Sequence, residues 1–224
     1  MAEAWHVKHL VDKAHALGAH RAAPLPAASV VVDERVRLKC RVPRCSSYAR
    51  NLMCPPHVPG PDETRATLAR YTDVLIVQRE ITVTQARVDE ALGGKTYAES
   101  RALDGGGAQT GAGAAPVAGG VAAAVDCDNE VTAAQNAFAK LMSALEAEAF
   151  KLGYRFAAAF AGGDCVLCEV CEGIEDGVCR HPFEARPSME AVGVDVIATA
   201  RAAGLDVEMP AVDHPSWTGM LLID

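Results

Sequence analysis

The chain has 224 residues, of which half are hydrophobic and 22% are charged, as in an ordinary soluble protein of one domain. Its net charge of −8 argues against a nucleic-acid-binding protein, which normally presents a basic surface. No run approaches the roughly 20 apolar residues of a membrane span. The first 18 residues carry scattered charges, so we expect no signal peptide. Eight cysteines in such a chain indicate a reducing cytoplasm, and metal ligation rather than disulfides.

The first half of the chain alternates between predicted helices and strands. Hydrophobic residues at helical spacing predict a helix over residues 5–17, ended by Gly18. Two short strands are expected at residues 29–32 and 35–39, around a turn at Asp33 and Glu34. Pro61 and Asp62 then open a helix to about Tyr71, and residues 74–77 form a buried strand. This succession favours a single α/β domain with a mixed sheet, helices packed on it and two cysteine-rich loops.

The second half begins with an unusual segment, residues 104–125, in which seven glycines lie among alanines. It has too little to bury to offset its ordering entropy, so we expect a flexible insertion within one domain over residues 1–224. Asp128 is expected to cap a helix that Gly153 ends, and a strand follows at 155–161. A helix is expected after Pro187, over residues 188–200, and strands at 205–208 and 219–223.

Four cysteines follow the predicted strand at 155–161. Cys165, Cys168, Cys171 and Cys179 form a C-x2-C-x2-C-x7-C pattern, and we call residues 165–179 the second cysteine loop. In a [4Fe–4S] cluster the ligands sit on different corners of a core several ångströms across, so a short loop can deliver a sulfur at every third residue. A single zinc ion usually takes two separated C-x2-C pairs. The spacing therefore predicts a [4Fe–4S] cluster, with a zinc site as the alternative.

Three further cysteines lie in the first cysteine loop, residues 40–59. Cys40, Cys45 and Cys54 are spaced C-x4-C-x8-C and are followed by two prolines. Beside the second loop this pattern favours a second cluster, while zinc or a structural role remains open. One ligand is unassigned, and Cys127 and His57 are the candidates. An iron without a fourth protein ligand is the third alternative, and it could bind a substrate as a Lewis acid, as in an enzyme.

Both loops resemble one known family. Residues 40–59 (CRVPRCSSYARNLMCPPHVP) and 165–199 (CVLCEVCEGIEDGVCRHPFEARPSMEAVGVDVIAT) are similar to DUF2284, a family of predicted metal-binding proteins. That family combines C-x4-C-x8-C-P-P with C-x2-C-x2-C…C-R-x-P…R-P-S-M-E-A. The resemblance implies metal or iron–sulfur binding in anaerobic-type metabolism and names no reaction. The insertion at 104–125 and Cys127 beside it lie outside the shared pattern.

The two loops differ in charge. Residues 35–50 carry six basic residues and no acid, whereas residues 164–179 carry five acids and no base. Positive surroundings favour a reduced cluster, so the first-loop cluster is predicted to have the higher potential and to receive electrons from the second. The alternative is that both runs are solvated surface. Arg180, His181 and Arg186 flank the last cysteine. The arginines are expected to hold the loop through carbonyls or to donate to cluster sulfides, and His181 to donate a hydrogen bond or a proton.

The sequence thus predicts a cytoplasmic iron–sulfur protein. Its expected activity is electron transfer, or service as a redox accessory subunit to a partner protein or a larger redox enzyme. The alternatives are an enzyme with an open iron and a protein whose zinc only holds loops together. No nucleic-acid or membrane partner is expected, and a homo-oligomer is left open.

Overall fold

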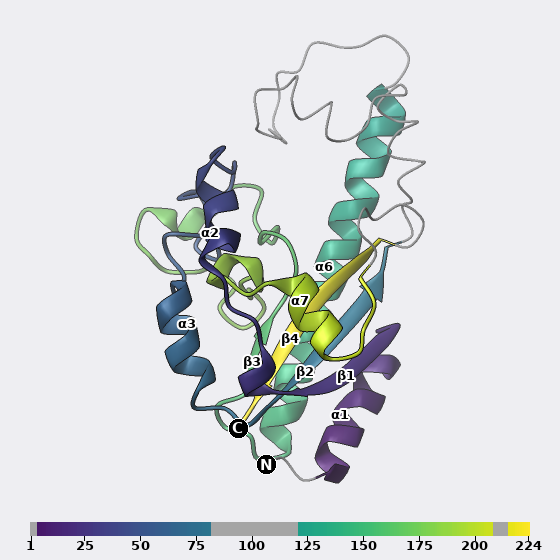
Figure 1. Cartoon of the computed structure of the whole chain (residues 1–224). Coiled ribbons are helices and arrows are strands. Elements are labelled where there is room, and N and C mark those ends of the chain that lie inside the picture. The colour runs from purple at the N-terminus through teal and green to yellow at the C-terminus, as the bar shows by residue number, and fades with distance from the viewer. Residues whose placement is uncertain (1–3, 82–120, 208–214) are drawn as a thin grey trace.

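The computed structural model describes residues 4–81, 121–207 and 215–224, without the side chains of 121–129. Four strands form one sheet in the order β1 (Arg21–Pro26), β2 (Asp73–Glu80), β4 (Ser216–Ile223) and β3 (Ala158–Phe160) (Figure 1). Each neighbouring pair is antiparallel. The α/β class is confirmed, but the sheet is antiparallel in these pairings rather than mixed. Strand direction depends on which distant segments pair, and hydrophobic periodicity does not report that.

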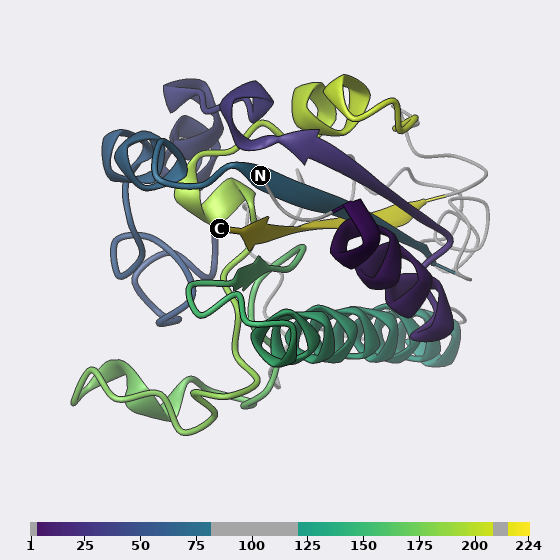
Figure 2. The ribbon, with the colours of Figure 1, turned by 90° about the horizontal axis from the view of Figure 1, so that it is seen from below.

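Helices cover both faces of this sheet, as the view from below shows (Figure 2). One face packs against α1 (Ala4–Ala16) and the long α6 (Val121–Lys151). The other packs against α3 (Pro61–Leu68), α7 (Val196–Ala202) and the short 3-10 turns η1 (Ala27–Ser29) and η3 (Glu190–Val192). Two further elements, α2 (Glu34–Arg41) and the 3-10 turn η2 (Glu172–Ile174), lie toward the end of the molecule that carries the cysteines. No described helix has the length and apolar character needed to span a membrane.

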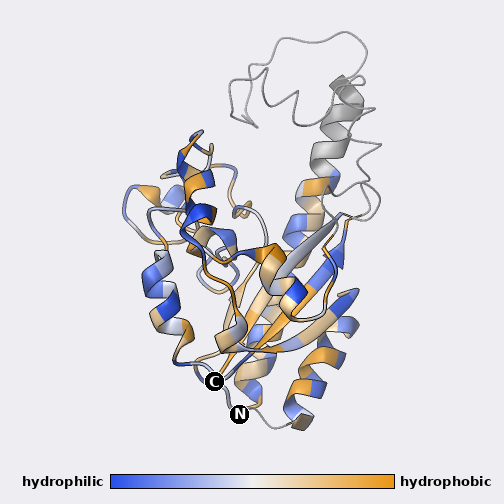
Figure 3. Ribbon diagram, viewed as in Figure 1, coloured by the Kyte–Doolittle hydropathy of each residue, from blue (hydrophilic) through white to orange (hydrophobic). Residues whose placement is uncertain are grey.

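The central strands are hydrophobic on both faces because both faces are covered. On β2, Leu75 and Val77 pack toward α1 and α6, whereas Val74 and Ile76 pack toward α7 and η3. Side chains of a strand alternate between the two faces, so a sheet buried on both sides needs a continuous apolar run. In Figure 3, hydrophobic residues lie along the C-terminal half of β4, whereas α3 carries mostly hydrophilic residues.

The segment before the first cysteine loop differs from its prediction. The two strands expected at 29–32 and 35–39 are absent, and α2 occupies 34–41 instead. Asp33 caps this helix, because its Oδ1 accepts the backbone N–H of Arg35 at 2.8 Å. The alternation of Val36 and Leu38 with basic residues suggested a strand, and the capping signal decided the outcome. The actual strand, β1, was missed because it contains two prolines, which an edge strand tolerates.

Other boundaries shift by smaller amounts. The helix expected to reach Tyr71 ends at Leu68, and the strand expected at 155–161 is confined to 158–160. The helix expected after Pro187 is divided into η3 and α7 by Gly193, whose φ is +89°. Residues 205–207 form no strand. Since α6 begins at Val121, Asp128 lies inside this helix and does not cap it. The predicted insertion lies outside the described residues up to position 120.

Candidate metal centre

The first cysteine loop begins on a helix. Cys40 lies in the last turn of α2, whereas Cys45 and Cys54 lie in the irregular segment that follows. The backbone N–H of Cys45 donates to the carbonyl of Cys40 at 3.1 Å, and the N–H of Cys54 donates to the carbonyl of Asn51 at 3.0 Å. The loop therefore turns back on itself, and these short-range bonds fix the backbone that carries its three thiols.

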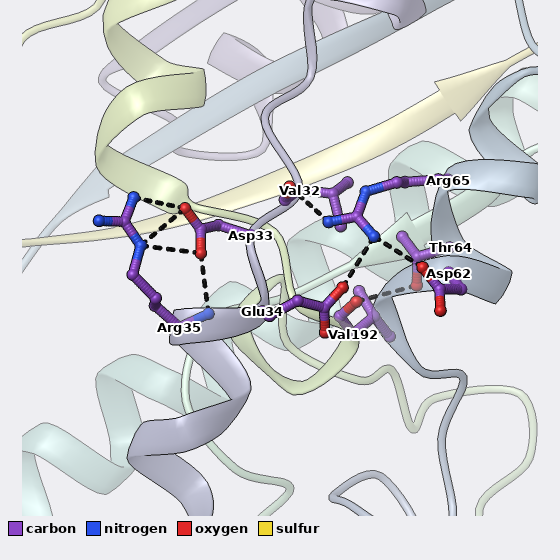
Figure 4. Close-up of polar contacts among 8 residues, drawn as sticks. All are labelled: Val32, Asp33, Glu34, Arg35, Asp62, Thr64, Arg65 and Val192. Atoms are coloured by element: carbon purple, nitrogen blue, oxygen red, sulfur yellow. Dashed lines mark hydrogen bonds and ion pairs between the residues drawn. The ribbon is translucent and has the colours of Figure 1, made fainter.

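Polar contacts fix the start of α2 on its neighbours (Figure 4). Arg65 of α3 donates to Oε1 of Glu34 at 2.7 Å and to the carbonyl of Val32 at 3.0 Å. Thr64, also on α3, donates to the carbonyl of Val192 at 2.9 Å, which ties η3 to the same helix. Arg37 is buried and donates to the carbonyl of Pro59 at 2.9 Å. The two ends of the first cysteine loop are thereby held together.

The second cysteine loop leaves the end of β3 through two glycines. An added Cβ at Gly162 would lie 2.9 Å from the Trp217 ring, and one at Gly163 would lie 2.8 Å from Nε2 of Gln135. Gly163 also has a φ of +73°, which side chains other than glycine rarely adopt. The start of the loop is therefore packed tightly against α6 and β4. This placement gives the loop a rigid base, as expected for residues that follow directly on a strand.

All four cysteines of the second loop line one pocket. Residues of the first loop form part of the same wall. The lining residues are Asn51, Leu52, Met53, Cys165, Leu167, Cys168, Cys171, Gly173, Cys179, Arg180 and His181. Gly173 is buried in this wall, and an added Cβ there would lie 2.3 Å from the carbonyl oxygen of Val178. The fold therefore brings the four predicted ligands of the second loop together around one space.

The two cysteine loops are in direct contact. Ser47 Oγ of the first loop donates to Oδ2 of Asp164 at 2.5 Å, just before the second loop begins. Asn51 Nδ2 donates to the carbonyl of Cys165 at 2.8 Å. Both ribbon views place the loops side by side at the same end of the molecule (Figures 1 and 2). Segments more than a hundred residues apart thus form one cysteine-rich region.

The thiols in this region are reduced and partly buried. None of the seven described cysteines forms a disulfide. Burial, with smaller contributions from the neighbouring Asp164, Cys45, Cys40 and Cys165, raises the pKa of Cys54 to about 12. Burial also raises the pKa of Cys40, with a smaller contribution from Cys45. Without a metal these thiols therefore hold their protons at neutral pH, and a bound cation would displace them.

Burial likewise raises the pKa of Cys165, and the thiols of Cys179, Cys168 and Cys171 add to the effect. A hydrogen bond from the backbone of Leu167 opposes it. The other three thiols of the loop thus oppose deprotonation of Cys165. Metal ions between deprotonated cysteines would relieve this repulsion.

The residues predicted to flank the last cysteine make distinct contacts. Arg180 donates to Oδ2 of Asp176 at 2.8 Å and to the carbonyl of Val178 at 3.3 Å, so it braces the loop from within. Arg186 pairs with Glu146 of α6, with Nε to Oε2 at 3.0 Å, and holds the end of the loop to the long helix.

His181 contacts one of the predicted ligands, Cys179, through its backbone and also lines the pocket. Its backbone N–H donates to Sγ of Cys179 at 3.3 Å. Hydrogen bonds of this kind to a ligating sulfur tune a cluster's potential. The sequence offers two candidates for the fourth ligand of the first loop. His57 is exposed. Cys127 lies in α6, and its side chain is outside the described part of the chain.

Sequence reasoning missed several residues that shape this centre. Asn51 and Gln135 are buried and hydrogen bond to the start of the second loop, and Glu146 holds Arg186. No spacing rule singles out such residues, because they act through contacts with distant segments. Asp164 could have been noticed as the acid directly before Cys165. Over the described residues, no three His, Cys, Asp or Glu side chains converge to hold one metal ion.

Comparison with known proteins yields a single finding. A search of the curated proteins and a search of the solved structures give no match. The family model described as "Predicted metal-binding protein (DUF2284)" matches residues 23–223, which include both cysteine loops and nearly all of the described fold. The chain therefore belongs to the DUF2284 family of predicted metal-binding proteins.

Proposed function

We propose that this protein binds iron–sulfur clusters and transfers electrons, as a carrier or as a redox accessory subunit. The observation that carries the proposal is the pocket lined by Cys165, Cys168, Cys171 and Cys179. Four reduced thiols at ferredoxin-like spacing around one space are the donor set of a [4Fe–4S] cluster. These residues would hold the first cluster, and Cys40, Cys45 and Cys54 would contribute to a second. When bound, each cluster supplies a one-electron redox centre.

The arrangement of the thiols favours a cluster over a single zinc ion. Structural zinc needs four ligands about 2.0–2.3 Å from one point. Nowhere in the described ranges do three metal-ligating side chains converge in that way. In an iron–sulfur cube each cysteine binds a different iron, so its sulfurs need not converge on one atom. The same side chains are therefore better suited to a core several ångströms across.

Electron transfer is supported by the contact between the loops. Ser47 bonds to Asp164, and Asn51 bonds to the carbonyl of Cys165, so the two sets of thiols lie on adjoining segments. Clusters held by these loops would therefore be neighbours. An electron that enters at one could pass to the other. A purely structural metal would make no use of this proximity.

The surface of the second loop supports a redox partner protein. Val170 and Val178 are 76% and 57% exposed, which is unusual for hydrophobic side chains beside a functional loop. Glu169, Glu172 and Glu175 are exposed around them, and Figure 3 shows hydrophobic and hydrophilic residues side by side on this loop. We expect a partner with a small apolar patch surrounded by basic residues. A reducing compartment, the cytoplasm, is part of the proposal because the thiols must stay reduced.

The test is iron, sulfide and zinc content per chain after anaerobic purification, together with the visible spectrum. We expect about eight irons and eight sulfides for two cubes, and a brown colour. Cys168→Ser should remove about four irons and leave the first-loop cluster. Val166→Ser, in the same loop, is the matched control and should keep all of them. Stoichiometric zinc without iron would refute the proposal.

A further inference from the structure

We infer that the chain forms a two-fold dimer in which the basic surface of each copy docks on the acidic surface of the other. The basic surface lies at the end of α2 and just after it and consists of Leu38, Lys39, Arg41, Val42 and Arg44. The acidic surface lies on the second cysteine loop and consists of Glu169, Val170, Glu172, Glu175 and Val178. The dimer supplies the partner expected under the proposed function, and it rests on that function only for the role of the contact in electron transfer.

Exposed hydrophobic side chains gather at the end of the molecule that carries the cysteines. The described residues expose nine large hydrophobic side chains, and five of these belong to the two surfaces or follow closely: Leu38, Val42, Val170, Val178 and Phe183. Leu38 and Val42 are 55% and 67% exposed. They lie one helical turn apart, because the backbone N–H of Val42 donates to the carbonyl of Leu38 at 2.9 Å. Single exposed hydrophobic residues are ordinary, but such a group at one end indicates a surface that another protein covers.

The charged side chains of both surfaces are exposed and unpaired. The three cations of the basic surface form no ion pair with any described residue, and neither do the three glutamates of the acidic surface. At the start of α2, by contrast, Arg35 pairs with Asp33 and Arg65 of α3 pairs with Glu34. Charges left without a local partner are available to a second protein, and they attract it more strongly once the contact excludes water.

The two surfaces are complementary to each other. Each combines two exposed hydrophobic side chains with three like charges, and the sign of the charge is opposite on the two. The acidic surface calls for a small apolar patch among basic residues, which the basic surface of a second copy provides. Each copy carries a net charge of −8, so two copies attract only in orientations that bring a basic surface to an acidic one. These features favour a second copy over an unrelated protein.

The placement of the surfaces allows this contact to form twice. Both lie at the end that carries the cysteines, with α2 on one side, the second loop on the other and the rest of the first loop between them (Figure 2). In a two-fold interface, a residue of one copy contacts a second residue of the other copy, and the reverse contact also forms. Each basic surface would therefore meet an acidic one. The predicted metal centres of the two copies would lie on facing ends.

The test is sedimentation velocity of the full chain, purified anaerobically, at several protein concentrations and in low and high salt. Iron is measured in each sample, and circular dichroism checks folding. The wild type should sediment as a dimer in low salt and dissociate as salt rises, because salt screens the charges. Lys39→Glu/Arg44→Glu and Glu169→Lys/Glu175→Lys should each be monomers, because like charges then meet at both contacts.

A mixture of these two variants gives the sharpest test. The first variant is acidic on both surfaces and the second is basic on both, so each matches the other but not itself. An equimolar mixture should therefore restore the dimer. Arg155→Glu/Arg201→Glu is the matched control, because it makes the same change of charge at exposed positions before β3 and on α7. It should remain a dimer.

The outcomes separate this inference from the proposed function. A monomeric wild type, a charge-reversed variant that stays dimeric, or a mixture that stays monomeric would overturn the dimer. Assemblies larger than a dimer would overturn its two-fold closure. A dimer without iron would overturn the proposed function alone, and a monomer with iron would overturn this inference alone. If a double variant does not fold, Arg44→Glu and Glu175→Lys are mixed in the same way.

Discussion

Two arginines near Cys179 form ion pairs that differ in burial, and this difference allows a quantitative test. The side chains of Arg186 and Glu146 are 15% and 12% exposed, whereas those of Arg180 and Asp176 are 42% and 49% exposed. We consider the replacement of each arginine by methionine. Methionine keeps much of the side-chain volume and removes the charge.

The expected costs follow from what each change leaves behind. Loss of one partner of a buried pair costs about 3–5 kcal/mol, because the other charge remains away from water. In Arg186→Met the Glu146 carboxylate still accepts the backbone N–H of Ala159, at 2.5 Å. We therefore expect a loss of about 3 kcal/mol in the free energy of unfolding, at the lower end of this range. The Arg180–Asp176 pair is open to solvent, which screens its charges, so Arg180→Met should cost far less than Arg186→Met. Whole domains are stable by about 5–15 kcal/mol, so the first change is large.

The assay is urea denaturation followed by circular dichroism, on the metal-free form of each protein. The double variant Glu146→Leu/Arg186→Met should recover part of the loss, because it leaves no charge buried, although the backbone N–H of Ala159 loses its acceptor. Arg186→Met should also lower the iron content, since Arg186 ties the end of the second loop to α6. Equal costs for Arg186→Met and Arg180→Met would refute this reasoning.

Three further predictions concern the loops directly. Gly173→Ala should abolish the second-loop cluster without unfolding the sheet, because the added Cβ would lie 2.7 Å from Leu52 Cδ1 and closer still to the Val178 carbonyl. Iron analysis together with circular dichroism checks this prediction, and an unchanged iron content would contradict it. In the metal-free protein the protonated Cys54 stabilises the fold below about pH 9, and this stability is lost as pH rises toward 12, by about 1.4 kcal/mol per pH unit. Denaturation curves from pH 8 to about pH 11 should show this slope, and it should be shallower in Cys54→Ala, where only Cys40 and Cys165 keep a raised thiol pKa. Parallel curves would be evidence against this prediction. The first-loop cluster should have the higher reduction potential of the two, since Arg37 and Arg41 favour negative charge at Cys40. An EPR redox titration in which the second-loop cluster has the higher potential would exclude this prediction.

Hydrophobic patterns predicted the elements that lie in the core. The run at 74–77 is a strand and the long apolar face before Gly153 is a helix, because burial itself sets these patterns. The patterns failed at residues 29–41, where side chains are largely exposed and a single cap at Asp33 determined the helix. Hydrophobic periodicity is a weaker guide in exposed segments, because packing against the core does not favour one conformation over another there.

The sequence by itself determined the class of chemistry. Thiols at steps of three restrict what the second loop can bind, and this holds whatever the fold, because a short loop carries its own ligands. The tertiary structure decided how the two loops relate. It placed Asp164 and Asn51 where one loop meets the other and brought Gln135 and Glu146 beneath them. The contacts of Asp164 and Asn51 between the loops join residues more than a hundred positions apart, and those of Gln135 and Glu146 join residues 29 and 40 positions apart. Only the packing of the sheet and α6 brings these residues within hydrogen-bonding distance.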